Sequence, residues 1–276
     1  TDWIRDIIRI ARDWKQEDFT RSFHEGLRKS IEAGTTALGD IVRNAGNVEF
    51  AGDLLHFRPF FEVIDFNPLT AENTMEQLKN RLKHYVPANR IAAAISPHTP
   101  YTVSDRLLKE CVKLAESDDR QVCIHLGETE AEREFLLSGT GEILEFRKEF
   151  GLPEHWKPPN KSPVCYLQEL GVLERPVILV HCNYIDDVEM DIIAASGSSV
   201  VFCPNSHRYF RHGRYPLEKL LEQGINVALG TDSLASSPSL SILEEMKTVR
   251  NEYPQVGSVE ILKLATSNGR KALGLP

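Results

Sequence analysis

Short apolar runs alternate with longer amphipathic stretches along the chain. Runs of strand length are predicted to form strands at 35–42, 57–64, 90–96, 122–126, 177–181, 199–203 and 226–230. Apolar residues at helical spacing predict helices at 3–11, 20–33, 74–85, 104–116, 130–137, 143–150, 164–170, 186–195, 217–223, 240–251 and 258–273. Ser104 is a typical N-cap for the fourth of these helices, and Gly34 is a typical stop for the second.

Strands that alternate with helices favour right-handed crossovers and a parallel sheet covered on both faces. The chain begins with a predicted helix that has no strand before it. We therefore expect an α/β fold of the (β/α)8 TIM-barrel type, with seven strands visible and the first one missing. A barrel commonly forms one unit at about this length of 276 residues, and no repeat or shift in composition marks a second domain. Residues 1–276 are thus predicted to be a single barrel core.

The stretch 151–163 interrupts this alternation with four prolines. We expect a surface excursion near the mouth of the barrel, where it could serve as a lid and shape the substrate pocket. Seven strands should also leave the first and last with unpaired backbone, unless these two strands approach each other. Exposed strand edges invite partners, so a homo-oligomer is one expectation.

Composition narrows the class of ligand. The net charge is −8, from 32 basic and 40 acidic residues, and no basic patch for a nucleic acid is evident. No apolar run approaches the ~20 residues of a membrane span, and no signal peptide is recognisable at the start, so we expect a cytoplasmic location without membrane partners. The five cysteines form no C-x-x-C pair, which argues against a disulfide framework or a structural zinc knot. A small-molecule substrate remains as the expected partner.

Four polar residues stand where predicted strands end, or just beyond. His125 and Glu128 follow one apolar run, His181 ends a second, and Asp232 follows a third. Because catalytic groups of α/β barrels gather at the carboxyl ends of the strands, we predict one site. Each residue alone has a structural alternative: a strand-end histidine is often a satisfied structural residue, and Glu128 could simply favour the start of the next helix through the helix dipole.

Two histidines and an aspartate suit a divalent ion, because zinc and iron accept neutral imidazole and carboxylate. A catalytic zinc usually has three protein ligands, so a further pair is expected on the missing strand. Glu128 is placed to move a proton in a metal-assisted hydrolysis. His98, between two prolines, should face the cavity and receive the substrate, and His207 occupies a similar place after another strand. Both could instead be ordinary loop histidines.

These residues lie in motifs that resemble the amidohydrolase superfamily, in particular its aminohydrolase branch of deaminases and triazine hydrolases. The matching pieces run through most of the chain: Ser-Pro-His-Thr-Pro-Tyr at 96–101, His-Leu-Gly-Glu at 125–128, Val-His-Cys at 180–182, Cys-Pro-Asn-Ser-His at 203–207, Leu-Gly-Thr-Asp-Ser at 229–233, and Ala-Thr-Ser-Asn-Gly-Arg-Lys-Ala-Leu-Gly at 265–274. In this order the set is specific.

The resemblance implies that His125 and Asp232 ligate one metal ion, most simply zinc, with iron or manganese as alternatives. It implies that Glu128 shuttles the proton, that His181 polarises the bond under attack, and that His98 contacts the ring or ribose of the substrate. The family's His-x-His pair, expected on the first strand, occurs nowhere in these 276 residues. The family's flanking β-sandwich segments are also not recognisable, so the resemblance implies a barrel core that is incomplete at both ends.

The leading hypothesis is a metal-dependent hydrolytic deaminase of an amino-substituted heterocycle, such as a purine nucleoside or an aminofutalosine-like compound. Metal-bound hydroxide would attack the ring carbon, and ammonia would leave. Hydrolysis of another group, such as chloride from a triazine, is the alternative with the same metal chemistry. A catalytically inactive barrel fragment or binding module is the alternative from another class. A phosphate-binding barrel is weakly supported, because no Gly-rich phosphate loop is evident.

Overall fold

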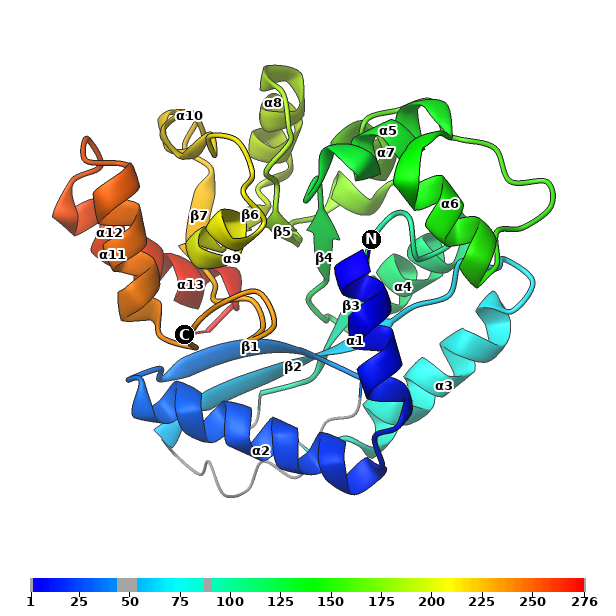
Figure 1. Ribbon diagram of the computed structural model, residues 1–276, viewed down its shortest axis with the longest axis horizontal. Helices are drawn as coiled ribbons and strands as arrows, with labels where there is room; N and C mark the ends of the chain where they lie inside the picture. The colour runs from blue at the N-terminus through cyan, green and yellow to red at the C-terminus, as the bar shows by residue number, and fades with distance from the viewer. Residues whose placement is uncertain (1, 44–53, 87–90, 276) are drawn as a thin grey trace.

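The computed structural model describes residues 2–43, 54–86 and 91–275. Seven strands lie within these residues in the predicted order, and helices separate them except between the first two, where the described residues contain no α-helix (Figure 1). The strands are β1 (Ala37–Val42), β2 (His56–Val63), β3 (Ala94–Pro97), β4 (Cys123–Leu126), β5 (Ile178–His181), β6 (Ser199–Phe202) and β7 (Asn226–Leu229). The predicted third strand began at Arg90, which lies outside the described residues.

All neighbouring strands pair in parallel, in two ladders of order β1-β2-β3 and β4-β5-β6-β7. The ladders meet through a bridge between Ile95 and Val122, and the amide of His125 donates to the carbonyl of His98 at 2.9 Å. The strands therefore follow one another in space in the order of the sequence. This arrangement places the carboxyl ends of all seven strands at one edge.

The helices occupy the predicted segments with small shifts. They are α1 (Asp2–Arg12), α2 (Gln16–Glu32), α3 (Ala71–His84), α4 (Asp105–Ser117), α5 (Glu130–Ser138), α6 (Gly141–Phe150), α7 (Pro163–Glu169), η3 (Val172–Glu174), α8 (Asp187–Ser196), α9 (Pro204–Tyr209), α10 (Leu217–Glu222), α11 (Ile242–Glu252), α12 (Ser258–Ala265) and α13 (Ser267–Ala272). Helix α2 begins four residues earlier than predicted, where the Asp18 carboxylate accepts the backbone N–H of Lys15 at 3.0 Å. The Ser104 hydroxyl caps α4 as expected, accepting from the amide of Leu107.

Two details of the helices were predicted wrongly. The expected helix at 258–273 is divided into α12 and α13, because Thr266 leaves the helical region with φ −131° and ψ −88°. The short helix α9 directly after β6 was not expected at all. Pro204 occupies its first turn, where the missing N–H of proline costs nothing.

Packing separates an inner and an outer layer. Inward side chains from β2 to β5, together with Cys203, pack with Ala272 and Leu273 at the end of α13, which fills the interior. Gly39 of β1 makes this close approach possible, because a Cβ there would lie 2.6 Å from a methyl carbon of Leu273. The outward side chains pack against the surrounding helices, as α2 does along β1 and β2 in Figure 1.

Strands β1 and β7 stand at the free ends of the two ladders, and the described residues contain no ladder between them. This agrees with the first of the two outcomes expected for a seven-stranded barrel. Helix α13 lies beside β7 instead. The side-chain amide of Asn268 donates to the carbonyl of Val227 at 2.8 Å, and the Asn226 amide donates to the carbonyl of Asn268 at 3.2 Å. A side chain thus satisfies part of the β7 backbone.

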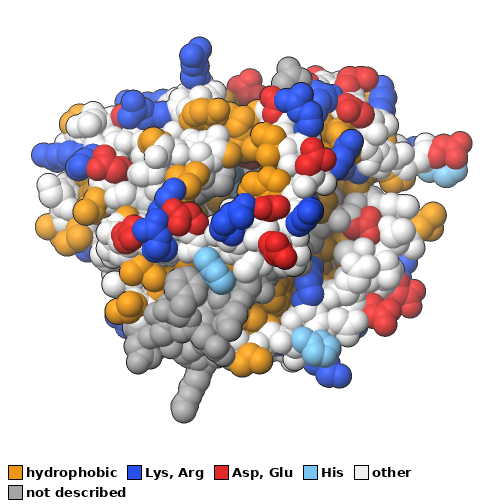
Figure 2. Space-filling model, turned by 60° about the horizontal axis from the view of Figure 1, so that its bottom comes forward, with side chains coloured by type: hydrophobic (Ala, Val, Ile, Leu, Met, Phe, Trp, Pro, Cys, Tyr) orange, Lys and Arg blue, Asp and Glu red, His pale blue; other side chains and the backbone are white. Residues whose placement is uncertain are grey.

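The excursion at 151–162 has no regular structure, as predicted, and Pro163 begins α7. It is anchored on the protein by Trp156, whose ring stacks on that of Phe135 at 4.4 Å between centroids. On the face shown in Figure 2, basic and acidic side chains are intermixed and do not gather into a patch of one sign. None of the described helices is long and apolar enough to cross a membrane.

Candidate functional site

The carboxyl end of β4 presents His125 and then turns sharply. Gly127 makes this turn with φ +59°, a left-handed conformation that glycine adopts more readily than other residues. The His125 ring lies between two other imidazoles, with centroids 5.1 Å from His98 and 5.5 Å from His181. Three of the predicted site residues are therefore brought together.

The end of β5 brings His181 to the same place. Its side chain is almost fully buried, and its Nε2 lies 3.8 Å from Oε1 of Glu128. His181 and the next residue, Cys182, have φ values of +74° and +53°, in the left-handed region that side chains other than glycine rarely adopt. Such backbone costs on the order of 1–3 kcal/mol per residue and tends to occur at functional sites.

Asp232 follows β7 and shares this strain, with φ +55°. Its Oδ2 accepts hydrogen bonds from the hydroxyls of Ser206 at 2.7 Å and Ser236 at 2.8 Å. Its Oδ1 accepts from the amide of Ser233 at 2.7 Å. Although burial acts to raise the pKa of Asp232, nearby His181, the two serine hydroxyls and His125 lower it overall. Asp232 is therefore held as a carboxylate within electrostatic reach of both histidines.

Burial controls the charge of the other groups. It lowers the pKa of His125 and of His181, with the neighbouring His181 adding to the effect on His125, so both rings are kept neutral. Burial raises the pKa of Glu128 to about 7. A carboxyl group that titrates near neutral pH is suited to both accepting and donating a proton.

His98 supports His125 through its backbone. The His98 carbonyl accepts from the amide of His125 and lies 3.2 Å from its Nδ1, which leaves Nε2 of His125 to face the site. The His98 ring is itself buried, with Nδ1 2.8 Å from the Thr102 hydroxyl, and burial lowers its pKa well below the usual value. His98 thus lies beside the other histidines, as the sequence predicted.

His207 is placed differently from His98. Both of its ring nitrogens face oxygen atoms, Nδ1 at 3.1 Å from Oδ1 of Asn183 and Nε2 at 2.6 Å from the carbonyl of Gly213. The ring is nearly buried. A neutral ring carries one N–H, so His207 donates to one of these oxygens, the closer being the Gly213 carbonyl, and both nitrogens lie against protein atoms.

Several neighbours of the site were missed by sequence reasoning. Ser206 and Ser236 bind Asp232, and both Glu132 and Asn183 bind the backbone of Glu128. Ser206 lies within a motif already singled out, and Glu132 stands four residues after Glu128 on the first turn of α5, but neither spacing identified a partner. These contacts depend on how the loops fold back over the strand ends.

Helix α1 reaches the same edge of the sheet. The Trp3 indole N–H donates to the carbonyl of Ala235 in the loop after β7, and its ring packs edge-on against Phe210 just after α9. Arg5 forms an ion pair with Glu149 of α6 at 2.9 Å. The N-terminal helix therefore connects the loop after β7 with helix α6 (Figure 1).

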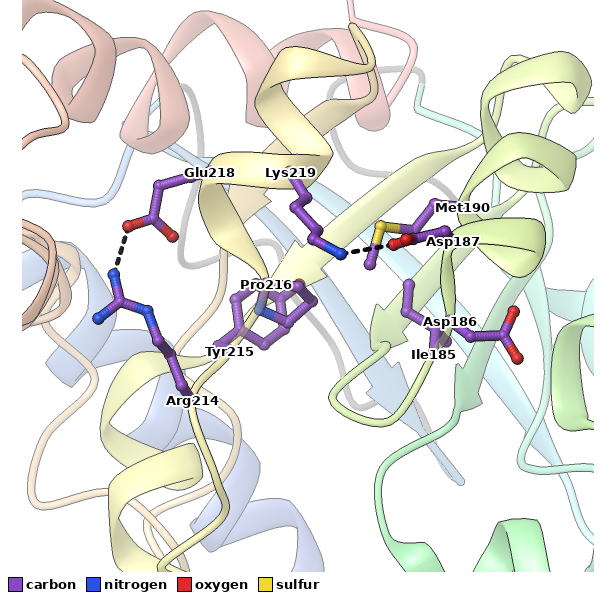
Figure 3. Close-up of a pocket in the computed structure, with 9 residues that line it drawn as sticks. All are labelled: Ile185, Asp186, Asp187, Met190, Arg214, Tyr215, Pro216, Glu218 and Lys219. Carbon is purple, nitrogen blue, oxygen red and sulfur yellow. Dashed lines mark hydrogen bonds and ion pairs between the residues drawn. The ribbon is translucent and has the colours of Figure 1, made fainter.

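A surface cavity of about 480 Å³ lies elsewhere, between α8 and α10 (Figure 3). The charged side chains on its walls are already paired, Lys219 with Asp187 at 2.7 Å and Arg214 with Glu218 at 2.5 Å. The cavity is lined by Ile185, Asp186, Asp187, Met190, Arg214, Tyr215, Pro216, Glu218 and Lys219, and by none of the predicted site residues. The strand ends are therefore the better candidate for chemistry.

The chain belongs to the amidohydrolase family, whose sequence pattern matches residues 12–276. It is 32% identical over 262 residues to 5'-deoxyadenosine deaminase of Methanothermobacter thermautotrophicus, covering 91% of this chain and 57% of that protein. The match confirms the resemblance seen in the motifs.

Solved structures agree on the fold. Helicobacter pylori aminofutalosine deaminase in complex with methylthio-coformycin matches with a TM-score of 0.78 at 21% identity, covering 91% of this chain and 62% of that one. An adenosine deaminase from Xanthomonas campestris with bound zinc matches with a TM-score of 0.72 at 24% identity, covering 99% and 61%. The chain thus has an α/β fold of parallel strands like these enzymes, and it spans about three fifths of the length of the proteins it matches.

Proposed function

We propose that this chain is the barrel core of a metal-dependent hydrolytic deaminase acting on an amino-substituted heterocycle, either a purine nucleoside or an aminofutalosine-like compound. The observation that carries the proposal is the convergence of His125, His181 and Asp232 around Glu128, on backbone that is strained at two of the four residues. The names of the relatives, which are deaminases of adenosine-like compounds, support this substrate class.

Zinc fits the donor chemistry of this site. His125 and Asp232 would hold the ion, because burial keeps the imidazole neutral and the carboxylate is ionised. Within the described part of the chain, however, no group of three His, Cys, Asp or Glu side chains is arranged to hold an ion. We therefore propose that the missing first strand of an eight-stranded barrel, with its His-x-His pair, completes the coordination. When bound, the ion would make water acidic at neutral pH.

The residues of this chain would then divide the proton transfers. Glu128 accepts a proton from water and passes it to the heterocycle, and the departing amine leaves as ammonia while the ring carbon gains the oxygen. His181, 3.8 Å from Glu128, stabilises the charge that develops on the attacked carbon's oxygen. His98, whose ring lies beside that of His125, contacts the ring or ribose of the substrate. Substrate binding would thus involve His98, Glu128 and His181.

Two other functions need to be distinguished. Hydrolysis of a different leaving group, such as chloride from a triazine, would use the same residues. A barrel core that binds but does not catalyse is favoured by one observation, the incomplete set of metal donors among the described residues. The metal content of the chain separates the non-catalytic barrel from the hydrolase.

The test combines metal analysis with a substrate panel. The purified chain is reconstituted with zinc, iron or manganese, the bound metal is counted, and ammonia release is measured with aminopurine nucleosides and aminofutalosine-type nucleosides. Chloride release from chlorotriazines is measured in parallel. Ammonia release that depends on the metal and is abolished in His125→Ala supports the deaminase. Chloride release alone favours the dechlorinase. About one bound ion per chain favours an enzyme, and a chain that binds no ion favours the barrel that does not catalyse. If the chain binds no metal and releases neither product, the proposal that it holds an active site is rejected.

A further inference from the structure

The backbone of Glu128 is held by a carboxylate that the chemistry above does not use. Glu132, on the first turn of α5, is completely buried. Its Oε1 accepts the amide of Gly127 at 3.0 Å and its Oε2 accepts the amide of Glu128 at 3.1 Å. Both oxygens of Glu132 therefore accept hydrogen bonds from the turn that contains Glu128, the proposed proton carrier.

Burying the carboxyl group of Glu132 costs free energy. Burial raises the pKa of Glu132 to about 8, although its two backbone hydrogen bonds act to lower it. Within the described residues, Glu132 forms no ion pair with a basic side chain. By contrast, Glu189 on α8 is equally buried and forms an ion pair with Arg133 at 2.7 Å. A buried carboxyl group without a cation costs stability, and here the two hydrogen bonds that it accepts both hold the turn that carries Glu128.

The opposite side of the same residue is held as well. The side-chain amide of Asn183 donates to the carbonyl of Glu128 at 3.0 Å. The Oδ1 of Asn183 faces Nδ1 of His207 at 3.1 Å, and Nε2 of His207 lies against the carbonyl of Gly213. A neutral His207 ring carries one N–H, which the closer Gly213 carbonyl accepts, so the direct contact of Asn183 is what holds the Glu128 carbonyl.

We propose that Glu132 and Asn183 are positioning residues that clamp the backbone of Glu128 from its two sides. The inference rests on the proposed role of Glu128 in proton transfer. The clamp sets where the Glu128 carboxyl stands relative to His181 and the substrate. A displacement of about 1 Å in such a group can cost on the order of 100-fold in rate.

The test compares Glu132→Gln and Asn183→Ala with the matched control Glu189→Gln. Glu189 also accepts backbone amides, those of Val164 and Asp186, but it does not touch Glu128. We expect kcat to fall about 10- to 100-fold in Glu132→Gln and about 10-fold in Asn183→Ala, with KM and metal content changed less than about threefold. Glu189→Gln should keep kcat within about threefold, even where its stability is lower.

A second measurement does not depend on activity. Amide hydrogen exchange at Gly127 and Glu128 should speed up about 10-fold or more in Glu132→Gln and stay unchanged in Glu189→Gln. A kcat within about threefold of wild type in both test variants, or an equal loss in the control, would overturn the positioning role. If the wild-type chain has no deaminase activity, the proposed function fails, and unchanged exchange in Glu132→Gln would separately reject the clamp. If Glu132→Gln does not fold, Asn183→Ala decides by the same criteria.

Discussion

At the scale of single residues, strain and burial meet at the strand ends. His181 and Asp232 sit on left-handed backbone, and Glu128 follows a glycine turn. Glycine would adopt the backbone of His181 and of Asp232 with less strain. The conformational cost at these two residues must therefore be offset by packing elsewhere. The burial that keeps the histidines neutral also raises the pKa of Glu128 to about 7. One physical cause thus acts on the proposed ligands and on the proposed proton carrier together.

Replacing Glu128 tests its role directly. We expect Glu128→Gln to lower kcat by about 100- to 10,000-fold, because the amide cannot carry a proton, while metal content stays the same. Steady-state ammonia release and metal analysis on the same sample measure both. Glu130→Gln, at an exposed position two residues further on, is the control and should keep wild-type turnover. A parallel loss of metal in Glu128→Gln would instead make Glu128 a ligand.

The buried Glu245 predicts a pH dependence of stability. Burial raises its pKa from 4.5 to about 7, although it accepts hydrogen bonds from the backbone and side chain of Asn205. The folded protein therefore holds this proton more tightly than the unfolded chain. Its contribution is fully present below about pH 4.5 and is lost as the pH rises through about 7.

The free energy of unfolding of the wild type should consequently fall more steeply between about pH 5 and about pH 8 than that of Glu245→Gln. Urea unfolding at several pH values gives the two slopes. Glu244→Gln, a substitution at the exposed neighbouring residue, should leave the wild-type slope unchanged. Identical slopes in wild type and Glu245→Gln would show that this carboxyl keeps an ordinary pKa.

At the scale of elements, α13 packs beside β7, which ends one of the two ladders in the described residues. It fills the interior with Ala272 and Leu273 and covers part of the β7 edge through Asn268. The Gln121 side chain, just before β4, donates to the carbonyl of Ala272 at 2.9 Å. Hydrogen bonds at both ends of α13 therefore connect this helix to β7 and to the residue that precedes β4.

Removing the Asn268 amide should weaken this junction. Asn268→Ala leaves the carbonyl of Val227 without its donor in a partly buried place, so we expect a loss of about 1–3 kcal/mol in the free energy of unfolding. Urea denaturation measures it. Lys271→Ala, at an exposed position of the same helix, should change stability by less than about 0.5 kcal/mol. Equal effects of the two substitutions would deny Asn268 this role.

The excursion at 151–162 is expected to exchange its amides faster than strands β4 and β5, since it has no ladder or helix hydrogen bonds to protect them. Its anchor is the stack of Trp156 on Phe135. Trp156→Ala should accelerate exchange further across the segment, while His155→Ala at the exposed neighbouring residue should not. Hydrogen exchange with mass spectrometry resolves both. Protection equal to that of the barrel strands would argue against a mobile lid.

At the scale of the whole molecule, strands β1 and β7 have a strand partner on one side only within the part of the chain that the structure describes. Closure is how barrels remove such edges, and unpaired backbone favours pairing with another strand. The 276-residue chain alone should therefore self-associate through these strands, and amides of β1 and β7 should exchange more slowly as concentration rises. Sedimentation velocity and hydrogen exchange over a concentration series test this. A strictly monomeric chain with concentration-independent exchange would show that α13 protects the edges sufficiently.

The sequence by itself determined the elements and their order. Periodicity located all seven strands and most helices, and the polar residues at strand ends identified His98, His125, Glu128, His181 and Asp232, which the fold brings to one edge. These features follow from local rules, since side-chain spacing, caps and prolines act over a few residues. A parallel sheet then collects the strand ends without further information.

Only the tertiary structure decided how the loops and the closing helix pack. The link from Gln121 to Ala272 spans 151 residues, and that from Trp3 to Ala235 spans 232. No local pattern encodes such pairs. The hydrogen bonds of Glu132 and Asn183 to the backbone of Glu128, and the contact of His207 with the Gly213 carbonyl, likewise depend on turns from different strands meeting in space. Spacing can predict which residues share an edge, but hydrogen bonds between loops form only where the whole sheet has set their distance.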